Sequence, residues 1–253
     1  MKIGAQTYTV RDFTQNERDF RESMKRIADI GYEYIQLSGA GSFNPRFIRD
    51  VCDENGLKIV LTHTKMDIIN DVDNVIKYHE ILGCKYIGIG GSGKKYRIPG
   101  WMDRFSADYY QPALDMKNAG YRFMYHTHSD EFGRVGDGRR LLDHLLEGMP
   151  EDVMGLTLDL YWLQYAGCDV LQWIEKLQNR LQCVHAKDVG LNGNQIIMAP
   201  VGEGNMNYPA IWDLLEKLGK TEYVLVEQDE CYMNNPFACL ESSYKYLNSL
   251  KNK

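Results

Sequence analysis

The sequence predicts an α/β fold, specifically a (β/α)8 TIM barrel of eight parallel strands. Short apolar runs alternate with longer amphipathic segments along the whole chain, and there are eight of each. The length of 253 residues is typical of this barrel. Because a helix follows each strand, neighbouring strands are expected to pair in parallel through right-handed crossovers.

The eight expected strands share an apolar body, rich in Ile, Val, Leu and Tyr, that ends at glycine or polar residues. Such runs are typical of strands that are buried on both faces of a parallel sheet. The strands are expected at Ile3–Val10, Tyr34–Gly39, Ile59–Lys65, Tyr86–Gly91, Tyr121–His128, Met154–Trp162, Leu181–Val189 and Tyr223–Glu230.

The eight expected helices carry apolar residues at helical spacing on one face. Arg18–Ile30 is the clearest example, and it ends at Gly31, because glycine adopts the left-handed cap at little cost. The other helices are expected at Pro45–Asn55, Asn70–Leu82, Ala107–Ala119, Arg139–Glu147, Val170–Gln178, Pro209–Leu218 and Pro236–Leu250.

An open, doubly wound sheet is the alternative layout. A nucleotide-binding sheet would need a glycine-rich first turn, and the residues after Val10 contain no glycine. The glycine cluster Gly88–Lys94 lacks the spacing of either common phosphate-binding fingerprint, so we interpret it as a strand end and an active-site loop. Without a linker or a change in composition, residues 1–253 are expected to form a single barrel domain.

The composition excludes several classes of protein. Hydrophobic residues make up 44% of the chain and charged residues 25%, which indicates a folded protein. The formal net charge of -6 argues against a nucleic-acid partner, because phosphate binding usually needs a basic face. No run is long enough to span a membrane, and the N-terminus lacks the apolar core of a signal peptide. We therefore expect a cytoplasmic protein without membrane or nucleic-acid partners.

The six cysteines form no C-x-x-C pair and mostly have apolar neighbours. We interpret them as reduced thiols, not as a disulfide framework or a zinc site.

Ionisable residues stand near the exits of the last four expected strands. In a (β/α)8 barrel these exits meet at the catalytic mouth, so the side chains should converge there. Imidazole nitrogens and carboxylate oxygens suit Mn, Zn, Co or Mg according to geometry, so the pattern predicts a divalent metal ion as cofactor. The expected ligands are His126, Asp159, His185 and Glu227.

The ligand from the fifth strand has an alternative. His126 occupies the position along its strand that the other three ligands occupy on theirs, but Glu131 follows closely and could replace it. His128 lies two residues after His126 and should point to the same side of the strand. It is expected to contact the substrate or to carry a proton.

Six blocks of residues follow one another along the chain: Gln6–Asp12, His126–Phe132, Leu158–Trp162, His185–Asp188, Gly202–Gly204 and Val226–Asp229. In this order they resemble the xylose isomerase-like TIM barrel superfamily, which includes sugar phosphate isomerases and epimerases and inosose dehydratases. The resemblance covers nearly the whole chain. Two positions depart from it: many members have Glu in place of His126, and several epimerases have His in place of Trp162.

The resemblance implies a metal-dependent isomerase or epimerase that acts on a sugar, a keto-sugar or a sugar phosphate. Proton transfer would proceed through a metal-stabilised enediolate. Glu227 is the expected base, with Glu131 or His128 opposite it. The implied partner is a small sugar, and the resemblance allows monomers, dimers and tetramers, so a homo-oligomer stays open.

Three other functions use the same scaffold. Loss of a hydroxyl after the same proton transfer would make the protein a dehydratase of the inosose or keto-sugar type. A non-catalytic sugar-binding barrel is the second alternative. An endonuclease acting at abasic DNA is the third, but it would need more metal ligands than this chain offers.

Several further residues are candidates for binding the substrate. His63 and Trp162 are expected to contact the sugar, and Lys187, which should share the side of His185, is expected to pair either with a substrate oxygen or with a carboxylate. Gln6 and Gln36 are expected either in the barrel wall or at the substrate, and Asp188 is expected to face away and cap a loop. The basic residues Lys94, Lys95 and Arg97 could attract an anion, while His79 and His144 are expected on helix surfaces.

Overall fold

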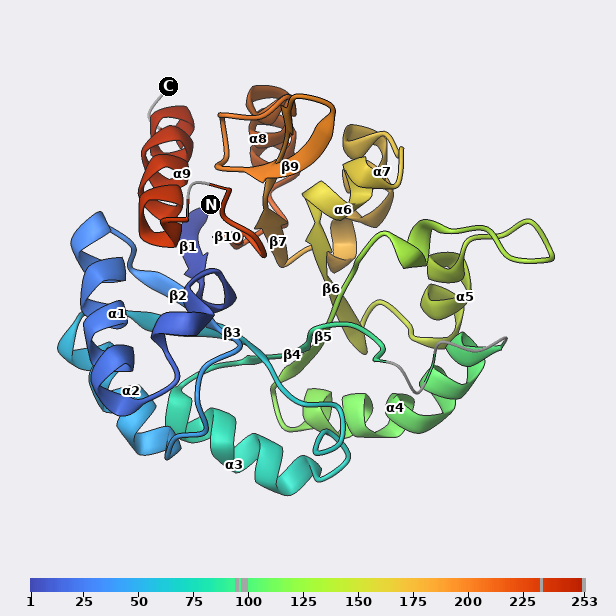
Figure 1. The fold of residues 1–253 in the computed structure, drawn as a ribbon. Coiled ribbons are helices and arrows are strands. Elements are labelled where there is room, and N and C mark those ends of the chain that lie inside the picture. The colour runs from blue at the N-terminus through green and yellow to red at the C-terminus, as the bar shows by residue number, and fades with distance from the viewer. Residues whose placement is uncertain (94–95, 97–99, 233, 252–253) are drawn as a thin grey trace.

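The computed structural model describes residues 1–93, 96, 100–232 and 234–251, and within them eight parallel strands close into a barrel. Around the barrel the strand order is β1-β10-β7-β6-β5-β4-β3-β2. The helices surround the strands, and the C-terminal helix α9 packs against α1 and β1 (Figure 1). The predicted TIM barrel is therefore confirmed.

The barrel strands are β1 (Lys2–Gln6), β2 (Tyr34–Leu37), β3 (Lys58–His63), β4 (Tyr86–Ile89), β5 (Arg122–His126), β6 (Met154–Asp159), β7 (Cys183–Ala186) and β10 (Tyr223–Val226). A separate antiparallel hairpin is formed by β8 (Asp188–Asn192) and β9 (Gln195–Ala199).

The helices are α1 (Glu17–Ile30), α2 (Pro45–Glu54), α3 (Val72–Leu82), α4 (Trp101–Asn118), α5 (Leu141–Gly148), α6 (Leu160–Tyr165), α7 (Val170–Leu177), α8 (Tyr208–Leu218) and α9 (Pro236–Lys251). Short 3-10 helices are η1 (Thr7–Phe13), η3 (Asp130–Phe132) and η4 (Gln178–Arg180).

Several strands end earlier than the apolar runs predicted. β1 stops at Gln6 and η1 follows it, whereas the sequence predicts a strand that continues to Val10. β6 stops at Asp159, and the apolar residues after it begin α6. The reason is local: Asp159 is the N-cap of α6, and its Oδ1 accepts a hydrogen bond from the backbone N–H of Trp162 at 3.0 Å.

The hairpin β8–β9 was not predicted, because its residues read as the end of a strand and a loop. Asp188 holds the hairpin and the loop that follows it in place. Its carboxylate accepts hydrogen bonds from the backbone N–H groups of Val189, Gly202, Gly204 and Met206. The predicted loop-capping role of Asp188 is therefore confirmed.

The interior of the barrel below the mouth is filled by a small apolar cluster. It comprises Val60, Leu61, Met124, Cys183 and Leu225. On β1 the position facing Leu225 is Gly4, where an added Cβ would lie 2.7 Å from Leu225 Cδ2. A residue larger than glycine would therefore collide with this packing.

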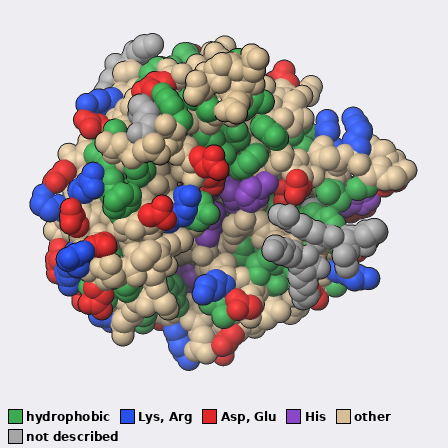
Figure 2. Space-filling view, in the orientation of Figure 1, with side chains coloured by type: hydrophobic (Ala, Val, Ile, Leu, Met, Phe, Trp, Pro, Cys, Tyr) green, Lys and Arg blue, Asp and Glu red, His purple; other side chains and the backbone are tan. Residues whose placement is uncertain are grey.

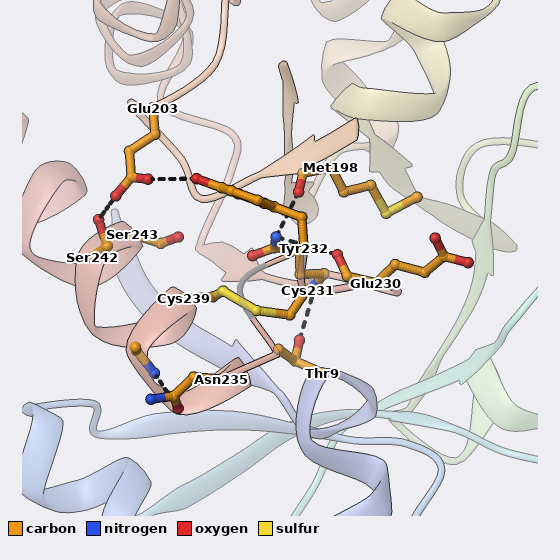
Figure 3. The surroundings of a disulfide bond; sticks show 12 residues. Thr9, Met198, Glu203, Glu230, Cys231, Tyr232, Asn235, Cys239, Ser242 and Ser243 are labelled. Carbon is orange, nitrogen blue, oxygen red and sulfur yellow. Dashed lines mark hydrogen bonds between the residues drawn. A yellow bond between two sulfur atoms is a disulfide. The ribbon is translucent and has the colours of Figure 1, made fainter. Parts of the chain in front are cut away.

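The prediction that all cysteines are reduced is wrong for two of them. Cys231 and Cys239 form a disulfide that ties the loop after β10 to the first turn of α9 (Figure 3). The other four are free and buried, as expected. Eight positions separate the paired residues in the sequence, and only the fold of that loop brings them together.

Among the described residues, no helix combines the length and the apolar composition that crossing a membrane requires.

The prediction that His79 is a surface residue is also wrong. His79 lies on the inner face of α3 and is fully buried. Its Nδ1 donates to the carbonyl of Val75 at 2.7 Å, which leaves Nε2 to accept from the hydroxyl of Thr62 on β3 at 2.8 Å. Burial lowers the pKa of His79 to about 4, so the ring is neutral at neutral pH.

We expect this buried ring to make the fold sensitive to acid. Unfolded His79 would take up a proton near pH 6.5, whereas the folded protein resists protonation down to about pH 4. Stability should therefore fall by about 3 kcal/mol as the pH drops through this window. Urea unfolding of wild type and His79→Gln between these pH values checks this. The variant keeps a donor and an acceptor and should show a shallower pH dependence; an unchanged slope would contradict the prediction.

Candidate active site

Four buried side chains from the carboxyl ends of β5, β6, β7 and β10 meet at the mouth of the barrel. They are His126, Asp159, His185 and Glu227, and each offers one ligand atom within 4.8 Å of all the others. Figure 2 shows histidine side chains at the bottom of a hollow near the centre of this face, with acidic side chains beside them. This cluster could hold a metal ion.

One carboxylate oxygen of Asp159 lies at the centre of the cluster. Asp159 Oδ2 is 3.2 Å from His126 Nε2 and 3.6 Å from His185 Nδ1. His185 Nδ1 in turn lies 2.8 Å from Glu227 Oε2. Strand register explains the proximity, since Asp159 on β6 pairs directly with His185 on β7.

The ammonium group of Lys187 belongs to the same cluster. Its Nζ lies 3.0 Å from Asp159 Oδ2, 2.6 Å from Glu227 Oε2 and 2.7 Å from Asp229 Oδ2. The side chain is buried, and the hydroxyl of Tyr208 donates to its backbone carbonyl at 2.7 Å. Lys187 therefore bridges the two carboxylates that could bind a metal.

The charges in this cluster stabilise one another. Burial alone would lower the pKa of Lys187, but the three neighbouring carboxylates outweigh it and raise that pKa. Burial alone would raise the pKa of Asp159 and of Glu227, but the Lys187 ammonium holds both well below their usual values. Both carboxyl groups are consequently ionised at neutral pH.

The two histidines respond to the cluster in opposite directions. Burial, with help from His185 and His128, lowers the pKa of His126 to about 3, so its ring is neutral. Burial would also lower the pKa of His185, but the carboxylates of Glu227 and Asp159 raise it. A neutral imidazole has a lone pair for a metal, and His126 satisfies this condition without a change in pH.

His126 Nδ1 is buried without a hydrogen-bond partner among the described residues, and His185 Nδ1 and Glu227 Oε2 have ion-pair contacts there but no hydrogen bond of good geometry. Buried polar atoms are normally paired, so such a group indicates a missing ligand. The three carboxylates of Asp159, Glu227 and Asp229 also carry two more negative charges than the single ammonium of Lys187 neutralises. A divalent cation fits both the unpaired nitrogen of His126 and the remaining charge.

His63 lies next to this cluster. Its ring centre is 5.1 Å from that of His126 and 5.7 Å from that of His185. Its Nδ1 lies 3.1 Å from Ser38 Oγ, whereas its Nε2 is buried without a partner among the described residues. Burial holds the pKa of His63 well below its usual value, so the ring is neutral.

His128 and Glu131 lie beyond the end of β5, because that strand stops at His126. The carboxylate of Glu131 is occupied: Oε1 accepts from the hydroxyl of Tyr125 at 2.6 Å and Oε2 from the backbone N–H of His128 at 2.8 Å. Glu131 is not part of the cluster that could hold a metal. Its hydrogen bonds instead fix the backbone at His128.

Two clefts open beside the cluster. One, of about 1120 Å³, is lined by His128, Glu131 and Trp101, among others. The other, of about 1090 Å³, is lined by Trp162 and Asp229 together with other residues. The rings of His128 and Trp162 are 5.8 Å apart, so the clefts approach each other at the mouth. Trp162 also lies 5.8 Å from the Lys187 ammonium. Lys94, Lys95 and Arg97, the basic run noted in the sequence, lie outside the described residues.

Two residues that contact the cluster received no definite role from the sequence. Gln6 Nε2 donates to Glu227 Oε1 at 2.7 Å, and Gln36 Oε1 lies 2.6 Å from His185 Nε2. Both glutamines are fully buried at the ends of β1 and β2. The sequence indicates these two contacts only by placing a glutamine at the end of each of two strands that are expected to be buried.

Comparison with known proteins agrees with this geometry. A family model described as a xylose isomerase-like TIM barrel matches residues 24–248. The chain belongs to this family. The resemblance noted in the sequence is thereby confirmed.

Proteins similar to this chain include an isomerase, a dehydratase and a sugar phosphate isomerase/epimerase. A 2-oxo-tetronate isomerase of Haemophilus influenzae is 22% identical over 83% of this chain and 87% of that protein. An inosose dehydratase of Lacticaseibacillus casei is 25% identical over 93% of this chain and 91% of that protein. The solved structure of a sugar phosphate isomerase/epimerase from Parabacteroides distasonis superposes with a TM-score of 0.80 at 22% identity, covering 98% of this chain and 93% of that chain.

Removing the buried ammonium should destabilise the protein strongly. Lys187→Met leaves buried carboxylates without their cation, and breaking a buried pair in this way typically costs about 3–5 kcal/mol. Lys25→Met is the control, because Lys25 pairs with Asp29 in an exposed ion pair that should contribute less than about 1 kcal/mol. Urea unfolding in the presence of a chelator measures both; equal stabilities for the two variants would contradict the prediction.

Proposed function

We propose that the protein is a divalent-metal-dependent isomerase or epimerase that moves a proton next to the carbonyl of a sugar, keto-sugar or sugar phosphate. The observation that carries the proposal is the buried cluster of two imidazoles and two carboxylates at the barrel mouth, whose ligand atoms lie within 4.8 Å of one another. Family membership and the isomerase and epimerase relatives support it.

His126, Asp159, His185 and Glu227 would hold the metal, which we infer to be Mn, Zn, Co or Mg. When bound, the cation would supply the positive charge that stabilises negative charge developing on the carbonyl and hydroxyl oxygens of the substrate.

Glu227 is the proposed base. Lys187 keeps its carboxyl ionised, and an ionised carboxylate next to the substrate can accept the α-proton. His128 is the proposed group on the other side, because it lines the adjoining cleft. Glu131 acts on the proton transfer through His128, whose backbone it holds. An epimerase would need both groups, one to remove the proton and one to return it on the opposite face.

Three residues are proposed to bind the sugar. The partner-free Nε2 of His63 can exchange a hydrogen bond with a hydroxyl. The three donors of the Lys187 ammonium face Asp159, Glu227 and Asp229, so Lys187 would bind a substrate oxygen by exchanging one of these contacts for it. Trp162 lines the second cleft and offers its ring to the apolar face of the sugar.

Dehydration is the second candidate reaction. The inosose dehydratase from L. casei is similar over 93% of this chain, and removal of the α-proton is the first step of both reactions. If a β-hydroxyl leaves after that step, the product is a dehydrated keto-sugar and not an epimer.

Exchange with solvent tests the proposed reaction. Protein loaded with Mn²⁺ is incubated in D₂O with ketoses, their phosphates and inososes. An isomerase or epimerase should place deuterium on the α-carbon of its substrate, observed by mass spectrometry and NMR. Loss of water from the substrate would identify the dehydratase instead. The absence of both changes across the panel would contradict the proposal.

Replacing the proposed base should abolish turnover. Glu227→Gln keeps the size of the side chain but cannot accept a proton, so kcat should fall by at least about 100-fold. Glu222→Gln is the control, since Glu222 bonds to Tyr86 at the opposite end of the barrel and should leave kcat unchanged. Circular dichroism verifies folding. Substantial activity in Glu227→Gln would remove this residue as the base.

A further inference from the structure

Two glutamines on neighbouring strands touch two of the proposed metal ligands. Gln6 at the end of β1 and Gln36 on β2 are directly paired in the strand register, and both are fully buried. Gln6 reaches Glu227, which directly follows the adjacent strand β10, whereas Gln36 reaches His185 on β7 across the barrel interior. Burying an amide costs free energy unless it is hydrogen-bonded, so these contacts call for an explanation beyond space-filling.

The amide of Gln6 has a fixed orientation. Its Oε1 accepts from the backbone N–H of Tyr8 at 2.6 Å, so its NH₂ group must face Glu227. There it donates to Oε1 of the carboxylate. The other oxygen, Oε2, is left facing Lys187 and His185 at the centre of the cluster.

Gln36 contacts His185 through its amide oxygen, while its NH₂ group is buried without a hydrogen-bond partner among the described residues. An amide oxygen can only accept, so its 2.6 Å contact places a proton on His185 Nε2. In the neutral ring the other nitrogen, Nδ1, then carries the lone pair. Nδ1 lies 2.8 Å from Glu227 Oε2, an oxygen that is also 2.6 Å from the Lys187 ammonium, and it makes no hydrogen bond of good geometry among the described residues.

We propose that Gln6 and Gln36 are positioning residues: each engages one atom of a metal ligand, so that the other atom of that ligand faces the centre of the cluster, where the cation would bind. This inference rests on the proposed metal-dependent function. It predicts that the tautomer of His185 and the orientation of Glu227 are set before the metal binds. Asp159 follows the same arrangement through the fold itself, because Oδ1 caps α6 and Oδ2 faces the cluster.

The test combines metal affinity with a direct view of the His185 ring. Gln36→Leu removes the acceptor, and the proton of a neutral ring should move to Nδ1, next to the Glu227 carboxylate. Gln36→Glu keeps an acceptor and should retain the Nε2 proton. Thr62→Val is the matched control, because it removes a buried hydrogen bond from β3 that leads outward to His79.

Mn²⁺ affinity is measured by isothermal titration calorimetry, and the tautomer by NMR of metal-free protein labelled with ¹⁵N-histidine. Gln36→Leu and Gln6→Met should weaken Mn²⁺ binding by about 10- to 100-fold, the range typical of residues that orient metal ligands. Gln36→Glu should bind within a few-fold of wild type, and Thr62→Val should bind like wild type. Urea unfolding of each metal-free variant separates lost affinity from lost stability.

Several results would overturn the inference. These are a neutral His185 protonated on Nδ1 in wild type, a Gln36→Leu variant that binds Mn²⁺ as well as Thr62→Val does, and an equal loss in Gln36→Glu and Gln36→Leu. If Gln36→Leu does not fold, Gln6→Met and the wild-type tautomer decide. If wild type binds no Mn²⁺, the proposed function fails, while the tautomer still tests whether Gln36 orients His185.

Discussion

Two carboxylates can be buried side by side at the mouth of this barrel because a buried ammonium lies between them. Lys187 contacts both Asp159 and Glu227 and is itself anchored by Asp229. Without that cation, burial would raise the pKa of each carboxyl group and favour its protonated form. A protonated carboxyl is neither a good metal ligand nor a base, so the proposed chemistry depends on this ion cluster.

Three of the cluster residues also contact the surrounding fold, each through the atom that does not face the centre of the cluster. Asp159 caps α6 with one oxygen, Glu227 accepts from Gln6 with one oxygen, and His185 contacts Gln36 with one ring nitrogen. In each case the remaining atom faces the same small volume. Secondary structure and site are therefore built from the same side chains, which restricts how far any of them can rotate.

The sequence patterns gave wrong predictions for the ends of several strands and for the burial of His79. An apolar run predicts burial, but it does not say where a strand stops, because the residues of α6 after Asp159 are as apolar as the strand before it. The same holds for His79, whose helical position suggests a surface although its ring is bonded to the barrel wall. In both cases a polar side chain, acting as a cap or as a buried partner, decided the outcome.

The alternation of apolar strands and amphipathic helices determined the barrel, because parallel strands with helical crossovers have few ways to bury their apolar faces. The same pattern identified His126, Asp159, His185 and Glu227 as neighbours, since strand exits converge in any such barrel. The tertiary structure decided which of its two expected partners Lys187 takes, a carboxylate, and it alone decided that Gln36 reaches His185 across the interior. Those contacts join residues that are distant in sequence, and their distances depend on the twist and register of the closed sheet, which no local pattern encodes.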